Sequence, residues 1–328
     1  MKTQESHPRK WVDFFRSNLQ RKASETVESR QRQLGDCSDP ALHRKAPQPY
    51  SPSMYLTPFT SLAWAYQLHY YLCFRTHRRR PLFTSKTSQL TEFVSEICAR
   101  HNYHALEYQS RSDQFRCLLS LRPAQAISKV IQTIKANSSR EYSQQFVLAK
   151  PVWARGFLAK SVGRMCTGAV RKYLEQQSQH HGYDSRVLPP IYRYRASQPV
   201  ELKAAHASFD LNHHLVFATC QRKGVFTSDF GKALSDYWLR VATMRGFAID
   251  QISVVPDHVH LLVRIVPKMS IEECVLLLMN NGQHFIGRNY PQALIEAGIN
   301  QLWEASVYAG TCGELTTALI KAWLNTPF

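Results

Sequence analysis

The chain has few acidic residues relative to its basic ones, and it lacks any long apolar run. Lys and Arg total 41 against 24 Asp and Glu, which gives a formal net charge of +17 and a pI near 9.7. No segment approaches the ~20 consecutive apolar residues of a membrane helix, and the N-terminus lacks the apolar centre of a signal peptide. We therefore expect a cytoplasmic protein with no membrane contact and a polyanionic partner, a nucleic acid in particular.

Cys-x-x-Cys pairs are also absent. The 8 cysteines are scattered along the chain, which argues against a zinc ribbon and against the disulfide framework of a small secreted protein. Cys166, Cys220 and Cys312 show no surroundings typical of a nucleophile. With 328 residues and 44% hydrophobic content, the chain is long and apolar enough for two domains with packed cores.

Residues 1–54 differ in composition from the rest. They are rich in Arg, Gln, Ser and Pro, show little periodicity, and end in a Pro-rich stretch typical of a linker. We interpret them as a basic, partly disordered N-terminal arm. A solvated tail without a function is the alternative, because charged ends are often only soluble.

The remainder contains an internal repeat. Residues 66–85 recur 143 residues later as 209–228, with Leu, Phe, Thr, Arg and Ser at matching positions and no gap. Each copy reads as an alternating strand, a basic turn, an amphipathic helix, a strand pair, a second helix, a Trp-led strand and a last helix. The predicted boundaries are 55–186 for the first domain, 187–204 for a linker and 205–328 for the second domain.

The strand pair of the second copy carries a histidine pair. His258 and His260 lie in an apolar stretch typical of a buried strand, whose period of two places both imidazoles on one face. They could share a divalent ion, although an isolated His-x-His is often only two satisfied histidines on a sheet. The first copy has Gln114 and Arg116 at these positions, and a guanidinium cannot ligate a metal.

The last helix shows the opposite pattern. The first copy has Tyr173 and Gln177, which lie four residues apart and so share one helical face, whereas the second copy has Trp323 and Pro327. Taken alone, Tyr173 reads as a surface tyrosine. The two copies are thus reciprocally incomplete, which favours complementary specialisation over the decay of one redundant copy.

These motifs together resemble the single-tyrosine transposases of the HUH superfamily, the insertion-sequence type that moves as single-stranded DNA, including REP-associated relatives. The resemblance covers both copies and leaves residues 1–54 outside. It rests on residues 78–80, 153–157, 161–163 and 170–177 of the first copy, and on residues 215–217, 221–223, 256–263 and 302–303 of the second.

The resemblance implies an α+β fold with two ferredoxin-like HUH domains, each an antiparallel sheet flanked by helices. Many members are dimers in which the tyrosine helix of one subunit can complete the metal site of the other. Carried over to this chain, the metal ligands are His258, His260 and Gln177, the ion is Mg²⁺ or Mn²⁺, and the nucleophile is Tyr173. The chain would then be a pseudo-dimer with one composite active site, and further oligomerisation is left open.

The implied activity is metal-dependent cleavage and rejoining of single-stranded DNA through a 5′-phosphotyrosine and a free 3′-OH. Lys172 or the metal would ease deprotonation of Tyr173. Asp257 either fixes the tautomer of a ligand histidine or simply ends the turn after Pro256, and both interpretations stay open.

Basic residues follow the first strand of each copy and are expected to contact the phosphates of a DNA hairpin, although a solvated basic turn is the alternative. The doublets His213-His214 and His180-His181 have no partner acid and are interpreted as surface histidines. The expected DNA contacts are Arg78, Arg79, Arg80, Arg222 and Lys223.

A second class of function is a catalytically inactive, domesticated transposase that acts as a DNA-hairpin-binding regulator. The degraded motifs favour it, and their complementary retention argues against it. A metallohydrolase for a small molecule is a third idea, but it lacks a carboxylate-rich site and leaves the charge of +17 without a role.

Overall fold

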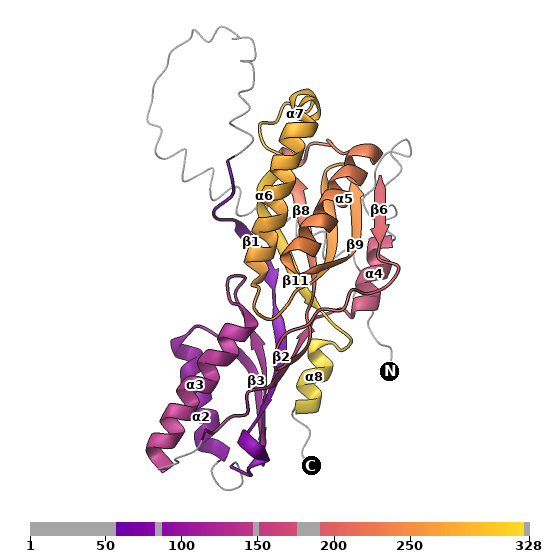
Figure 1. Cartoon of the computed structure of the whole chain (residues 1–328). Coiled ribbons are helices and arrows are strands. Elements are labelled where there is room, and N and C mark those ends of the chain that lie inside the picture. Colours follow the sequence, from indigo (N-terminus) through magenta and orange to yellow (C-terminus); the bar gives the residue numbers. More distant parts are fainter. Residues whose placement is uncertain (1–56, 83–86, 147–150, 176–190, 325–328) are drawn as a thin grey trace, which may run out of the picture. The chain divides into compact units, whose positions relative to one another are not determined.

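A computed structural model describes residues 57–82, 87–146, 151–175 and 191–324 (Figure 1). They fall within one compact unit, Ser51–Phe328. The expected N-terminal arm, Gln177 and His180-His181 lie outside the described residues.

Both copies follow the predicted order of elements. Those of the first are β1 (Ala63–Gln67), β2 (His69–Arg75), the short turn η2 (His77–Arg79), α2 (Thr87–Arg100), β3 (His104–Arg111), β4 (Gln114–Ser120), α3 (Ile127–Phe146), β5 (Phe157–Val162) and α4 (Thr167–Glu175). Strand β6 (Tyr192–Arg195) follows, within the expected linker. Those of the second are β7 (Ala207–Asp210), β8 (Asn212–Thr219), η4 (Cys220–Arg222), α5 (Ser228–Arg245), β9 (Ala248–Val255), β10 (His258–Arg264), α6 (Ile271–Asn289), α7 (Pro291–Glu296), β11 (Trp303–Cys312) and α8 (Thr317–Leu324).

Each copy forms a sheet whose edge strand comes from the other copy. The strand orders are β3-β4-β2-β5-β7 in the first copy and β1-β11-β8-β10-β9-β6 in the second. The exchanged strands pair in parallel, β7 with β5 and β1 with β11, whereas all other pairs are antiparallel. The exchange is symmetric in register, because Phe157 pairs with Ala207 just as Val307 pairs with Trp64.

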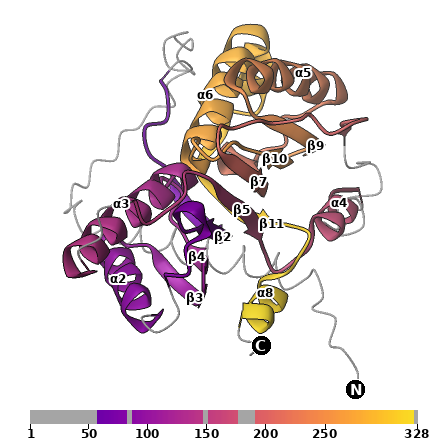
Figure 2. The ribbon, with the colours of Figure 1, turned by 60° about the horizontal axis from the view of Figure 1, so that its bottom comes forward.

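Two helices cover one face of each sheet, α2 with α3 and α5 with α6 (Figures 1 and 2). Equivalent aromatic residues fill the two cores. Phe74 meets Trp153 with ring centroids 4.8 Å apart, and Phe217 meets Trp303 at 5.7 Å. Burial of such aromatic pairs contributes to the stability of each half separately.

The last helix of each copy lies against the sheet of the other copy. Val170 and Leu174 of α4 pack on Leu262 of β10, and Ile320 and Leu324 of α8 pack on the first sheet. The two copies therefore form a single-chain pseudo-dimer with reciprocally exchanged strands and helices.

The chain segments that lead to these helices cross at two glycines. A Cβ on Gly163 would lie 2.0 Å from the carbonyl oxygen of Thr311, and one on Gly313 would lie 2.1 Å from that of Ser161. The first turns of the helices are fixed at the same place, since Thr167 N donates to Gly313 O and Thr317 N to Gly163 O, both at 2.8 Å. Only glycine permits so close an approach.

Equivalent residues of the two copies meet at the centre of the pseudo-dimer. The hydroxyl of Tyr70 lies 2.8 Å from Nε2 of His213, the residue 143 positions later. His213 is fully buried, and burial lowers its pKa to about 3. The interpretation of His213 as a surface histidine is therefore wrong. Among the described residues, no helix is both long enough and apolar enough to cross a membrane.

Candidate functional site: a histidine cluster joined by a tyrosine helix

The histidine pair lies on β10, between β8 and β9 of the second sheet. His258 and His260 are 2% and 4% exposed, and their ring centroids are 4.8 Å apart. The strand period places both on the face that α4 covers, because Leu262 of the same face packs on that helix. Histidines so deeply buried need defined partners.

Asp257 is the hydrogen-bond partner of His258. Its carboxylate lies 2.7 Å from Nδ1 of His258, which orients the ring through this nitrogen. Its other oxygen lies 2.9 Å from Nε of Arg222. Burial lowers the pKa of His258, which favours the neutral ring that a metal ion requires. This geometry favours the tautomer-fixing interpretation of Asp257.

His214 of β8 contacts the second histidine at the same ring nitrogen. Its Nε2 lies 3.1 Å from Nδ1 of His260, and the rings stack with centroids 5.3 Å apart. Burial lowers the pKa of His214 to about 4. The interpretation of His214 as a surface histidine is wrong, because its ring contacts those of His260 and Tyr173. His213, next to it in the strand, points to the opposite face of the sheet, because side chains alternate along a strand. The same alternation, applied to β8, could have found it.

Tyr173 reaches this cluster from the first copy. It projects from α4, and its ring centroid lies 5.7 Å from that of His260 and 6.1 Å from that of His214, edge-on in both cases. Lys172, one residue earlier, is exposed, as expected for a neighbour on a helix that does not share its face. The catalytic roles of Tyr173 and Lys172 stay predictions.

A buried ionic group fixes α4 at this place. Asp250 of β9, 2% exposed, accepts from Arg264 at 2.9 Å and from Arg171 of α4 at 3.1 Å. Gln251 also donates to the backbone carbonyl of Arg171, at 3.4 Å. The ion pair between Arg171 and the buried Asp250 therefore holds the tyrosine helix against the second sheet, two residues before Tyr173.

The donor set fits a divalent ion in part. Nδ1 of His258 lies within hydrogen-bonding distance of Asp257, and Nδ1 of His260 lies within that distance of His214, so Nε2 is the atom of each ring that could ligate an ion. Within the described ranges, no group of three His, Cys, Asp or Glu side chains could hold a metal ion. The predicted third ligand, Gln177, lies outside them, two residues beyond the described end of α4.

The basic turns have an unusual backbone. Arg78 and Arg79 have positive φ angles of 55° and 53°, and the equivalent Gln221 and Arg222 have 54° and 56°. Consecutive left-handed residues of this kind cost about 1–2 kcal/mol each, and strain repeated in both copies points to a functional constraint. Arg78, Arg79 and Lys223 are exposed.

Two of the five predicted DNA contacts already have partners in the protein. The Arg80 side chain donates to the carbonyl oxygens of Pro151 and His77, and Arg222 pairs with Asp257. Arg222 therefore orients Asp257 beside the histidine cluster, whereas Arg80 stabilises the basic turn of the first copy.

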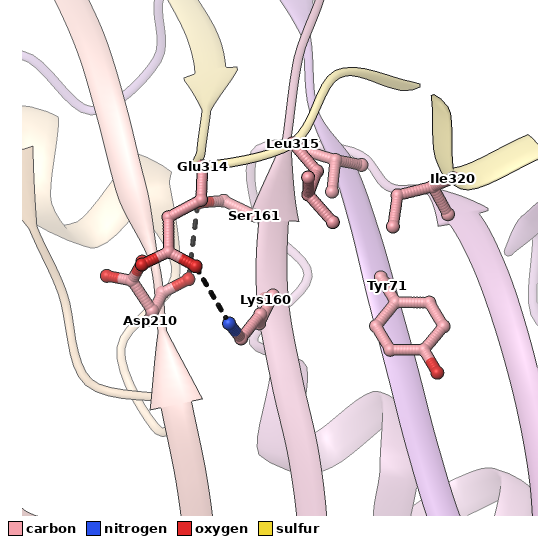
Figure 3. A pocket seen from close by; sticks show the side chains of 8 residues that line it. Tyr71, Lys160, Ser161, Asp210, Glu314, Leu315 and Ile320 are labelled. Carbon is pink, nitrogen blue, oxygen red and sulfur yellow. Dashed lines mark hydrogen bonds and ion pairs between the residues drawn. The ribbon is translucent and has the colours of Figure 1, made fainter. Parts of the chain in front are cut away.

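The corresponding place in the first copy has different chemistry. Arg116 donates to the side-chain oxygens of Gln114, at 2.9 Å, and Gln109, at 3.2 Å. Tyr71 stands where the second copy has His214. A small pocket beside Tyr71 is lined by Lys160, Asp210 and Glu314 among others, and Lys160 pairs with Glu314 at 3.1 Å (Figure 3).

Comparisons with known proteins identify the family of the chain. Residues 64–177 and 207–326 each match the sequence pattern of the IS200-like transposases. The chain is 27% identical over 129 residues to the ISDra2 transposase TnpA of Deinococcus radiodurans, covering 39% of this chain and 92% of that one. It is 22% identical over 125 residues to the transposase for insertion sequence element IS200 of Salmonella typhimurium, covering 38% of this chain and 82% of that one.

A solved REP-associated tyrosine transposase bound to a REP hairpin is also similar. It is 13% identical, with a TM-score of 0.26, and the match covers 44% of this chain and 78% of that one. The family pattern matches both copies, which together make up more than half of the 328 residues. The chain therefore belongs to the family of IS200-like transposases, with two copies of the family's domain fused in one polypeptide.

Proposed function

We propose that the chain is a metal-dependent transposase that cleaves and rejoins single-stranded DNA at one composite site. One observation carries the proposal: α4 of the first copy brings Tyr173 to the histidine cluster of the second, whereas the reciprocal place has Arg116 and Gln114. The fused chain thus keeps one of the two sites of a dimer.

The reaction requires one bond to form as another breaks. The phenol oxygen of Tyr173 attacks the scissile phosphorus, the bond to the 3′ oxygen breaks, and the phenolic proton passes to that oxygen through solvent. The products are a 5′-phosphotyrosine and a free 3′-OH. Rejoining reverses these steps without a nucleotide cofactor, because the covalent link conserves the energy of the broken bond.

The residues of the composite site have separate roles in this reaction. His258, His260 and Gln177 would hold Mg²⁺ or Mn²⁺, which supplies charge neutralisation at the phosphate. Asp257 and His214 would orient the two rings through Nδ1, so that each ring presents Nε2 to the ion. Docking of α4 aligns Tyr173 for in-line attack.

The DNA is proposed to be a hairpin, held by the strained basic turns of both copies. Arg78, Arg79 and Lys223 are exposed there, and phosphate contacts of this kind need exposed cations. A related transposase was solved with a REP hairpin. A single nucleophile cannot process two DNA ends at once, so the chain acts on them in sequence or as a larger assembly.

The competing function is a hairpin-binding regulator without catalysis, which the loss of the histidine pair from the first copy favours. To separate the two, the protein is incubated with Mn²⁺ and single-stranded oligonucleotides from the DNA that flanks its gene, then run on a denaturing gel. A 3′ label should move with the protein as a covalent adduct, and Tyr173→Phe should abolish it.

Tyr66→Phe is the matched control, because Tyr66 is 43% exposed and distant in sequence from α4. Its adduct should equal that of the wild type. Hairpin binding without any adduct in the wild type would support the regulator, and an adduct that survives Tyr173→Phe would show that the nucleophile is another residue.

A further inference from the structure

The first copy carries three arginines on the sheet face where the second copy has its histidine cluster. Gln114 of β4 lies directly opposite Arg75 of β2 on one side and Arg111 of β3 on the other, and Arg116 lies two residues further along β4. Residues directly opposite in a sheet, and residues two apart in a strand, share a face. We call Arg75, Arg111 and Arg116 the arginine face.

The strand registers show what the second copy has at the same places. The counterparts of Arg75, Arg111 and Arg116 are Ala218, Val255 and His260. Loss of a metal site by random decay has no reason to add positive charge at two apolar positions. The substitutions have instead put fixed cations where the other half is proposed to hold a divalent ion.

Arg116 is held in a defined orientation. Its Nη2 donates to Oε1 of Gln114 at 2.9 Å, and its Nη1 to Oε1 of Gln109 at 3.2 Å. Gln109 in turn donates to the backbone carbonyl of Leu324, at the end of α8, at 2.7 Å. The side chain is partly exposed, and the two glutamine oxygens are uncharged acceptors that orient the guanidinium.

The arginines of this face lie close enough to affect one another. Arg111 has its pKa lowered by partial burial and by the neighbouring Arg116, as expected for cations held close together. Arg75 lies 3.9 Å from Asp113, which offsets part of its charge. The pocket beside Tyr71 is a poorer anion site, because Asp210 and Glu314 line it and Glu314 pairs with Lys160 (Figure 3).

We infer that the arginine face binds a phosphodiester of single-stranded DNA, without a metal ion and without cleaving it. The inference rests on the proposed function, since it assumes that single-stranded DNA is the partner. Guanidiniums suit this task because their planar N–H groups match phosphate oxygens. The half without catalysis is then a second anchor that retains one DNA segment while the composite site acts on another.

A structural role for Arg116 is the competing explanation, since a cation near the end of α8 also interacts favourably with the helix dipole and Gln109 connects the two. The two roles predict different behaviour. A phosphate contact affects the salt dependence of DNA binding, whereas support for α8 affects stability.

The test measures binding of a fluorescent single-stranded oligonucleotide in EDTA over a series of salt concentrations, in the full chain with Tyr173→Phe so that no adduct forms. Arg116→Gln should weaken binding about tenfold or more. It should also reduce the slope of log K against log salt by about 0.7, the value for one phosphate contact on a single strand. Arg122→Gln, which removes an exposed arginine outside this face, should leave the slope unchanged.

Arg116→Lys separates the two roles, because it keeps the charge and loses the paired bonds to Gln114 and Gln109. The inference predicts that the lysine variant retains the salt slope. An unchanged slope in Arg116→Gln overturns the inference, as does equal weakening in both variants with a matching loss of thermal stability. Failure of the proposed function is a separate result, namely no Mn²⁺-dependent adduct on the wild-type protein.

Discussion

The crossing of the two copies gives the sharpest structural prediction. Gly313→Ala places a Cβ 2.1 Å from the carbonyl oxygen of Ser161, whereas ordinary contact begins at 3.4 Å. The crossing segments must therefore separate by about 1.3 Å. This strains the bond from Thr167 N to Gly313 O, which fixes the start of the tyrosine helix α4.

The expected cost combines two effects. Overpacking of a closely packed site costs about 1–3 kcal/mol, and the weakened backbone hydrogen bond adds about 1 kcal/mol. For a chain of this size, about 3 kcal/mol lowers the melting temperature by about 6–12 °C. Because α4 carries Tyr173, adduct formation should fall together with stability.

Thermal unfolding followed by circular dichroism measures the effect. Gly168→Ala is the matched control, because this glycine lies in α4 with no atom within 4 Å of an added Cβ. The control should be neutral or stabilised by up to about 1 kcal/mol, the usual gain of alanine over glycine in a helix. Equal melting temperatures for Gly313→Ala and Gly168→Ala would refute the crossing.

Three further predictions follow from the site and the centre of the pseudo-dimer. His214→Ala should weaken Mn²⁺ binding, measured by calorimetry, about 10- to 100-fold through the freed ring of His260, whereas the exposed His284→Ala should not. Asp250→Ala should cost about 3–5 kcal/mol in urea unfolding, because two guanidiniums lose their buried carboxylate. Burial lowers the pKa of His213 to about 3, so on acidification the unfolded chain takes up a proton on this ring before the folded protein does. The buried neutral ring therefore contributes fully to stability above about pH 6.5, and this contribution falls as the pH is lowered. His213→Gln should remove about 2 kcal/mol of the loss between pH 7 and pH 5, and an unaltered pH profile would contradict this.

Much of the fold could be predicted from the sequence, because both copies show the local periodicities of strands and amphipathic helices. Alternating residues predict the strands of both copies. Amphipathic periods predict helices at about 90–101 and 231–245, within three residues of the observed bounds of α2 and α5. The fold class also holds. The juxtaposition of Tyr173 with His260 came from the family resemblance and from reciprocal loss, since nothing in either segment alone indicates it.

The strand exchange could not be predicted, because β1 and β2 read as one continuous run. Leu68 separates the part that pairs with β11 from the part that pairs with β4, and it has no feature that marks a change of sheet. His213-His214 was missed for a related reason. The doublet was read as one surface feature, whereas one ring points to Tyr70 and the other to His260.

Mixing two inactive variants tests the central claim most directly. One chain carries Tyr173→Phe and the other His258→Ala with His260→Ala, and both are incubated with Mn²⁺ and the 3′-labelled single-stranded DNA that gives an adduct with the wild type. The account predicts no adduct from the mixture, because each chain must supply its own tyrosine and its own histidines. An adduct at a level comparable to the wild type would show that the site forms between chains, and would contradict a composite site within one.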